Sequence, residues 1–116
     1  MTVELACLFC RIIDGSIAAE IVSYDDATVA FRDRSPQAPT HILVVPRFHI
    51  SNASQLSAEN PTLWIALMTM ATRVAGLENL IHGYRLVLNT GDDGGQTVEH
   101  IHVHVLGNRA LAWPPG

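Results

Sequence analysis

One run of alternating residues near the carboxyl end, from His100 to Val105, limits the fold of this chain more than any other segment. It reads His-Ile-His-Val-His-Val. Successive side chains of a β-strand point to opposite faces of a sheet, so this run as a strand would carry three imidazoles on one face and three branched apolar side chains on the other. The pattern predicts a half-buried strand bearing a row of histidines spaced about 6.6 Å apart.

The row of histidines favours a functional role, because half of the 6 histidines of the chain lie in this one window. Neutral imidazoles could bind a transition metal, or one imidazole could attack a phosphorus atom while its neighbours neutralise charge and orient or protonate the substrate. The loop from Thr90 to Thr97 directly precedes the row and contains three glycines. Free backbone N–H groups of such a loop suit phosphate oxygens, which favours the phosphorus chemistry.

Hydrophobic periodicity and turn residues predict two helices and five strands in the rest of the chain. A short helix beginning near Leu8 should end at Gly15, and a longer helix should run from Pro61 to Leu77 with Asn60 as its N-cap. The tract from Asp33 to Thr40 is rich in proline and should be a loop. The predicted strands are Ala19 to Ser23, Ala27 to Arg32, His41 to Val45, Tyr84 to Asn89 and Ile101 to Leu106.

Composition indicates one folded domain with a small-molecule partner. With 116 residues, 48% apolar and 16% charged, the chain can bury one core. The net charge is -4 and the basic residues are scattered, which argues against a nucleic acid polymer as partner. No apolar stretch approaches the roughly 20 residues of a membrane span, and Met1 to Ala6 does not resemble a signal peptide. We expect a soluble cytoplasmic protein with no membrane partner, in which cysteines remain reduced.

The alternating run and its flanking segments resemble the histidine triad (HIT) family, specifically its Hint-like branch. The matching motifs are the histidine run itself, Gly94-Gly95-Gln96-Thr97 before it, Trp113-Pro114-Pro115-Gly116 after it, and the segment 31–41. The resemblance implies a single HIT domain over residues 1–116. It also implies an α+β fold in which a five-stranded antiparallel sheet, one main helix and a short N-terminal helix form a homodimer with a ten-stranded sheet.

The resemblance further implies a nucleotide-binding hydrolase that cleaves the P–N bond, or a related bond, of purine nucleoside monophosphate derivatives. His102 looks like the nucleophile that forms a nucleotidyl-histidine intermediate. His104 looks like the phosphate partner that assists the leaving group, and His41 and His100 look like supporting members of the cluster. This chemistry requires no catalytic cofactor.

The same resemblance implies a nucleotide pocket with three kinds of contact. Asp33 resembles a ribose-binding carboxylate, although by itself it would be interpreted as a loop residue. Apolar side chains would form walls around the base, although without the resemblance they would be assigned to the core. Polar residues and a glycine would contact the phosphate. The walls are Phe9, Ile12 and Phe31, and the phosphate contacts are Asn89, Gly95, Gln96 and Thr97.

Two cysteines near the N-terminus suggest a second site. Cys7 and Cys10 are separated by two residues, a spacing that lets both sulfurs bind one zinc ion, and His49 and His100 are available as further ligands. Some members of the HIT family resemble this arrangement of two cysteines and two histidines, and the resemblance implies a structural zinc ion. Two buried thiols or a redox pair are the alternatives.

Other functions remain open at this level. The pocket could sense a nucleotide with little catalysis, the substrate could be a dinucleoside polyphosphate, or the triad could bind a metal required for activity. His82 belongs to none of these groups, and we expect it at a helix end or in solvent. The C-terminal Trp113 segment is either a terminal anchor or a functional element.

Overall fold

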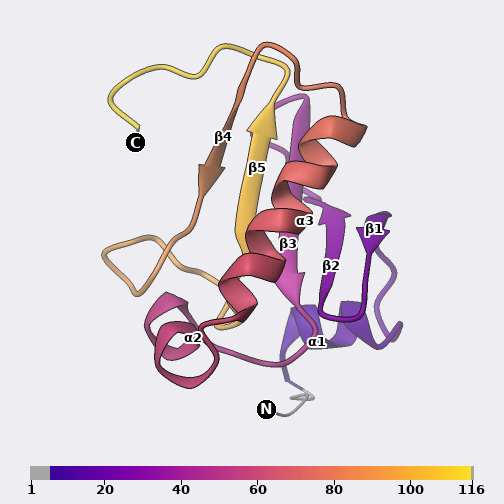
Figure 1. Ribbon diagram of the computed structural model, residues 1–116, viewed down its shortest axis with the longest axis vertical. Helices are drawn as coiled ribbons and strands as arrows, with labels where there is room; N and C mark the ends of the chain where they lie inside the picture. Colours follow the sequence, from indigo (N-terminus) through magenta and orange to yellow (C-terminus); the bar gives the residue numbers. More distant parts are fainter. Residues whose placement is uncertain (1–5, 116) are drawn as a thin grey trace.

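The computed structural model describes residues 6–115 and confirms the predicted α+β fold. All neighbouring strands pair antiparallel, in the order β1-β2-β3-β5-β4. The helices are α1 (Leu8–Ile13), α2 (Ala53–Glu59) and α3 (Leu63–Leu77), and the strands are β1 (Ile21–Tyr24), β2 (Thr28–Arg32), β3 (Thr40–Pro46), β4 (Tyr84–Val87) and β5 (Val103–Gly107). Figure 1 shows α3 lying across the sheet, with β4 at an uncovered edge.

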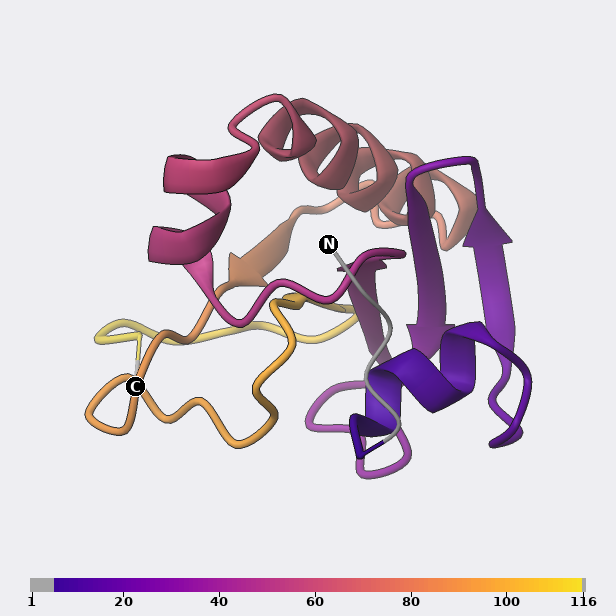
Figure 2. The same cartoon turned by 90° about the horizontal axis from the view of Figure 1, so that it is seen from below.

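The two faces of the sheet are covered by different helices, as Figure 2 shows with α2 and α3 on one side and α1 on the other. Alternate residues of β3 serve the two cores: Ile42 and Val44 pack in the α3 core, whereas Leu43 and Val45 pack in the α1 core. Apolar burial on both faces explains why β3 is buried along its whole length. The functional candidates lie on the α1 face.

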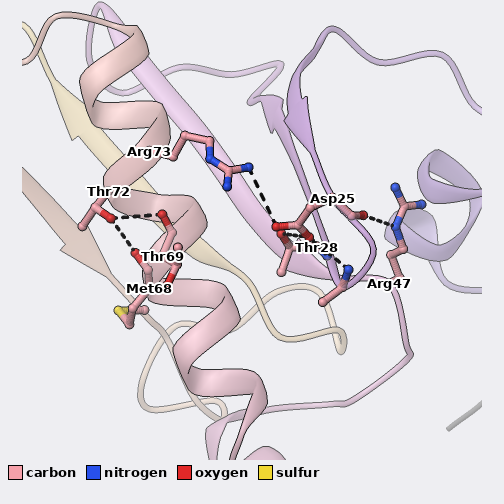
Figure 3. Close-up of polar contacts among 8 residues, drawn as sticks. Asp25, Thr28, Arg47, Met68, Thr69, Thr72 and Arg73 are labelled. Carbon is pink, nitrogen blue, oxygen red and sulfur yellow. Dashed lines mark hydrogen bonds and ion pairs between the residues drawn. The ribbon is translucent and has the colours of Figure 1, made fainter.

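A polar network holds the turn between β1 and β2 (Figure 3). Asp25 Oδ1 accepts hydrogen bonds from the backbone N–H of Ala27 and Thr28 and from the Thr28 hydroxyl, at 3.0, 2.7 and 2.9 Å. Arg47 Nε donates to the Asp25 carbonyl at 2.8 Å, and Arg73 Nη1 of α3 lies 3.9 Å from Asp25 Oδ2. One aspartate therefore closes the turn between β1 and β2 and links it to α3.

The prediction for the start of the main helix was wrong. Asn60 is not an N-cap but the C-cap of α2, and α3 begins at Leu63. The sequence of α2 contains only one buried residue, Leu56, so it carries no apolar periodicity. Asn52 caps it by accepting from the Gln55 N–H at 3.0 Å, and this N-cap with a glutamine three positions later was the signal that could have revealed the helix.

The histidine run is extended, but only its second half belongs to the sheet. β5 begins at Val103, which pairs with Val44, whereas the Ile101 N–H donates to the Ile50 carbonyl at 2.7 Å outside the ladder. The prediction of one regular strand over the whole run was therefore wrong at its start. Its alternation persists, because Ile101, Val103 and Val105 are all buried in the α3 core.

Among the described residues, no helix combines the length and the apolar character that crossing a membrane requires.

Candidate active site

A cluster of four imidazoles lies on the α1 face where β3 and β5 run side by side. The ring centroids of His102 and His104 are 4.9 Å apart, and those of His104 and His41 are 5.1 Å apart. His100 lies at the far end, where Phe9 of α1 packs against both His100 and His102. The structure therefore brings together the four histidines that the sequence analysis selected.

The ring of His102 is oriented by the backbone of its own segment. Its Nδ1 lies 2.8 Å from the carbonyl oxygen of His100. A carbonyl only accepts, so Nδ1 carries the proton and Nε2 of the neutral ring keeps its lone pair. Burial lowers the pKa of His102, against the opposing effects of the His100 carbonyl and of Asp33. A buried, neutral imidazole with a lone pair on Nε2 is equipped to act as a nucleophile near neutral pH.

His104 and His41 form a hydrogen-bonded pair, with 2.8 Å between His104 Nδ1 and His41 Nε2. Burial, together with repulsion from His102 and His41, lowers the pKa of His104 to about 4. Burial also lowers the pKa of His41, which the nearby Asp33 carboxylate partly opposes. Both rings are therefore neutral at pH 7.

A cavity of about 650 Å³ opens beside the histidines. Its wall includes His102 and His104, the loop residue Asp33, and apolar side chains of α1 and β2. This combination of apolar surface with a few polar groups is typical of a small-molecule site. The predicted base walls Phe9, Ile12 and Phe31 all lie on it, and so does Thr97.

Asp33 is held at the rim of this cavity. Its Oδ1 accepts from the Ser35 N–H at 2.8 Å, and its Oδ2 lies 3.4 Å from His41 Nε2. Atoms of Asp33, His41 and His104 lie close enough together to be considered as metal ligands. However, His41 Nε2 and His104 Nδ1 are hydrogen-bonded to each other at 2.8 Å. These two nitrogens would have to separate before both could bind a metal ion.

The glycine-rich loop is organised from within. Gln96 is buried, its Nε2 donates to the carbonyls of Ser51 and Val98, and its Oε1 accepts from the Gly91 N–H. The Gln96 side chain thus holds the loop, and it is not among the residues that line the cavity. Asn89 Nδ2 donates to the Gly94 carbonyl at 2.7 Å, so this side chain also supports the loop.

Glycine is required at two points of this loop. A Cβ at Gly94 would lie 2.2 Å from the Thr90 carbonyl oxygen, and Gly95 has a φ of +79°. Neither Asn89 nor Gly95 is among the residues that line the cavity, whereas Thr97 is.

The sequence analysis missed several residues of the wall. Arg34 and Glu20 contribute charge, and Leu43 lies between His41 and Val45 on the same face of β3. The alternation of β3 could have identified Leu43, because residues two apart share a face. Nothing in the local pattern indicates Arg34 or Glu20, which reach the cavity from separate segments.

A cluster of possible metal ligands lies beside the active site. The Cys7 sulfur is 3.3 Å from His100 Nδ1, and the Cys10 sulfur is 3.5 Å from the Nδ1 atoms of both His100 and His49. With Zn–S and Zn–N bonds of about 2.3 and 2.0 Å, a tetrahedral ion separates sulfur from nitrogen by about 3.6 Å. All four ligand atoms lie within 4.8 Å of one another. The donor set therefore fits zinc.

His100 connects the two sites. Its Nε2 donates to the Pro46 carbonyl at 2.9 Å, which leaves the Nδ1 lone pair directed at the cysteines. Its own carbonyl orients His102. A metal held by His100 would thus steady the segment that aims the neighbouring imidazole, while having no direct contact with the cavity.

A profile of the HIT domain matches residues 14–111. The chain belongs to the HIT family. The matched range includes the histidine run, Asp33 and the glycine-rich loop, whereas α1 and both cysteines lie before it. The HIT assignment therefore does not depend on the cysteines of the candidate metal site.

Relatives of this HIT protein cover almost all of the chain. An uncharacterised HIT-like protein of Synechococcus elongatus is 50% identical over 109 residues, which are 94% of this chain and 96% of the relative. A HIT family hydrolase from Legionella pneumophila is 45% identical with a TM-score of 0.91, covering 95% of this chain and 99% of that one. A histidine triad protein from Clostridium difficile has the same TM-score at 34% identity, with 97% of each chain covered. These similarities support a hydrolase.

The low pKa of His104 predicts that acid destabilises the fold. An imidazole of the unfolded chain titrates near pH 6.5, whereas folded His104 titrates at about 4. Between these values the unfolded state binds more protons, so the free energy of unfolding should fall as the pH is lowered through this interval. Urea denaturation at about pH 7 and pH 4.5 measures this change. The His104→Gln variant should lose part of it, and an unchanged pH dependence in that variant would contradict the assignment.

Proposed function

We propose that this HIT protein is a purine nucleoside phosphoramidase of the Hint-like type, which cleaves the P–N bond of a nucleoside monophosphate derivative through an intermediate on His102. The observation that carries the proposal is the hydrogen bond from His102 Nδ1 to the His100 carbonyl beside a 650 Å³ cavity. This bond leaves Nε2 of His102 as the atom with a lone pair. A nucleophile oriented by a third group is the arrangement that covalent catalysis requires.

The reaction would proceed by two displacements. In the first, His102 Nε2 forms a bond to phosphorus, the P–N bond breaks, and the amine departs with its bonding electron pair and takes up a proton. In the second, water attacks phosphorus, the bond to Nε2 breaks, and the nucleoside monophosphate leaves. Two inversions predict net retention of configuration at phosphorus.

The nucleotide would lie along the cavity with its phosphate at the histidines. Phe9, Ile12 and Phe31 provide the apolar surface for a purine, and the carboxylate of Asp33 at the rim is suited to accept hydrogen bonds from two ribose hydroxyls. Thr97 and His104 would contact the phosphate oxygens. Asn89, Gly95 and Gln96 would act through the shape of the loop, because Asn89 donates to the Gly94 carbonyl and Gln96 accepts from the Gly91 N–H.

We also propose that Cys7, Cys10, His49 and His100 hold a structural zinc ion. Four protein ligands leave no open position for water, so the ion would supply no catalytic step and would join α1 to the segment that carries His102. The purine walls Phe9 and Ile12 lie on the same helix as Cys10. Zinc would therefore stabilise one wall of the cavity.

A homodimer formed through β4 is the third part of the proposal. β4 is an edge strand that α3 leaves uncovered (Figure 1), and its Tyr84 and Leu86 are 40% and 36% exposed. An exposed edge with apolar side chains is a surface for pairing with a second copy. Pairing of two β4 strands would give the ten-stranded sheet.

We expect Leu86→Glu to convert the dimer to a monomer, because two carboxylates would be buried near the two-fold axis. Light scattering after size-exclusion chromatography should give twice the 12.6 kDa chain mass for the parent protein and one chain mass for the variant. Ile21→Glu is the matched control, since Ile21 is 44% exposed on the opposite edge strand. A monomeric parent protein, or a dimeric Leu86→Glu variant, would contradict this interface.

A comparison of substrates tests the proposed reaction. Adenosine and guanosine phosphoramidates should be hydrolysed with kcat/KM values at least about tenfold above those of diadenosine polyphosphates. If only the diadenosine polyphosphates were hydrolysed, the protein would be assigned as a dinucleoside polyphosphate hydrolase and not as a phosphoramidase. Tight binding of AMP without turnover of any of these compounds would favour a sensing module.

A further inference from the structure

A chain of hydrogen bonds links a backbone N–H of the 33–40 loop to His104. The N–H of Gln37 donates to His41 Nδ1 at 3.0 Å, and His41 Nε2 lies 2.8 Å from His104 Nδ1. His104 also lines the cavity. Within residues 6–115, no hydrogen-bond partner is found for the remaining ring nitrogen of His104, Nε2.

The direction of each hydrogen bond in this chain follows from its first member. A backbone N–H can only donate, so His41 Nδ1 must accept and can carry no proton. A neutral His41 then has its proton on Nε2, which donates to His104 Nδ1. His104 Nδ1 in turn accepts, and the proton of a neutral His104 is on Nε2.

We propose that the backbone N–H of Gln37 sets the tautomers of His41 and His104, so that His104 presents an Nε2–H donor to a phosphoryl oxygen in the cavity. Gln37 is thus a positioning residue that acts through two imidazoles. The proposal rests on the proposed function only for the identity of the acceptor, since the tautomers themselves exist without substrate.

The tautomer limits what His104 can do. A neutral imidazole is a weak acid, because loss of its Nε2 proton would leave an imidazolate anion, whereas donating a hydrogen bond creates no charge on the ring. The tautomer therefore suits His104 to stabilise charge on the phosphoryl oxygen by a hydrogen bond. The proton taken up by the leaving amine would then come from the substrate or from water.

His102 has the opposite tautomer and provides a control within the same site. Its proton is on Nδ1, bonded to the His100 carbonyl, and its lone pair is on Nε2. The backbone thus assigns different roles to two chemically identical rings two residues apart. One ring directs a lone pair at phosphorus, and the other directs an N–H at the phosphoryl oxygen.

Nitrogen-15 NMR of the histidine rings tests the proposal directly. In the parent protein near pH 7.5, we expect pyridine-type Nδ1 and pyrrole-type Nε2 signals for His41 and His104, and the reverse for His102. Spectra of His41→Gln and His104→Gln variants provide the assignments. A pyrrole-type Nδ1 on His104 would overturn the proposal.

Two substitutions at position 37 separate the backbone donor from the side chain. Gln37→Pro removes the N–H and should give mixed tautomers at His41 and His104. We expect kcat to fall by about threefold or more. Loss of the His104 donor itself would typically lower kcat by about a hundredfold. Gln37→Ala keeps the N–H and removes an exposed side chain whose Nε2 donates to the Ser35 carbonyl at 3.0 Å, so both tautomers should stay as in the parent protein. Parental tautomers in a folded Gln37→Pro variant would overturn the proposal.

The NMR and kinetic results separate this inference from the proposed function. The expected tautomers without phosphoramidate turnover would contradict the proposed function alone. Turnover with the opposite tautomer at His104 would contradict the inference alone.

Discussion

His102→Ala should lower kcat for an adenosine phosphoramidate by at least about 10⁴-fold, because it removes the atom that bonds to phosphorus. The affinity for AMP should change by less than about threefold, since the apolar walls and Asp33 remain. Steady-state kinetics and isothermal titration calorimetry measure the two effects separately. The expected split between turnover and binding distinguishes a nucleophile from a residue that merely shapes the cavity.

His82→Ala is a suitable control for this experiment. His82 is exposed and lies in the segment between α3 and β4, away from the histidine cluster. It should leave both kcat and AMP affinity at parental values. A His102→Ala variant with near-parental kcat would reject the nucleophile assignment, and loss of AMP binding together with turnover would indicate a damaged pocket instead.

Loss of the metal site should have the largest effect on stability. Cys10 is fully buried and bonds to two histidines, so Cys10→Ser should abolish metal binding and lower the Tm by at least about 10 °C. The physical reason is that zinc binds the folded chain and contributes its binding free energy to folding. Elemental analysis of protein purified without chelator should give about one zinc per parental chain and less than about a tenth in the variant.

A chelator provides the matched comparison for this prediction. It should lower the Tm of the parent protein toward that of Cys10→Ser, and it should leave the Tm of the variant unchanged. Because the His100 carbonyl orients His102, kcat should fall as well when the metal is removed. Parental protein with no zinc and a Tm insensitive to chelator would exclude the structural ion.

Much of the fold could be predicted from the chain because its strands carry strong local signals. The alternation in the histidine run and the apolar residues of β2 and β3 identified the strands of the central sheet. Periodicity identified α3, but it could not reveal α2, whose one buried residue, Leu56, produces no pattern. The start of β5 was also misplaced, since an extended run can leave a ladder without any change in its alternation.

The candidate site was predictable in its members and less so in their roles. Residue types and spacing were enough to select the histidine row and the cysteine pair, whereas Asp33 was selected only through the resemblance to the HIT family. Gln96 was assigned to phosphate, and only the structure shows its amide bonding to backbone groups of Gly91, Ser51 and Val98. A side chain that can face either a ligand or its own loop is decided by contacts remote in sequence.

The sequence by itself determined that three imidazoles share one face beside a glycine-rich loop, because a period of two is a local property of an extended backbone. Only the tertiary structure decided which nitrogen of each ring carries a proton. That choice depends on the carbonyl of His100, the N–H of Gln37 and the carbonyl of Pro46. The His100 carbonyl is close in sequence to the ring of His102. By contrast, only folding brings the Pro46 carbonyl to His100, and only folding brings the Gln37–His41 pair to His104.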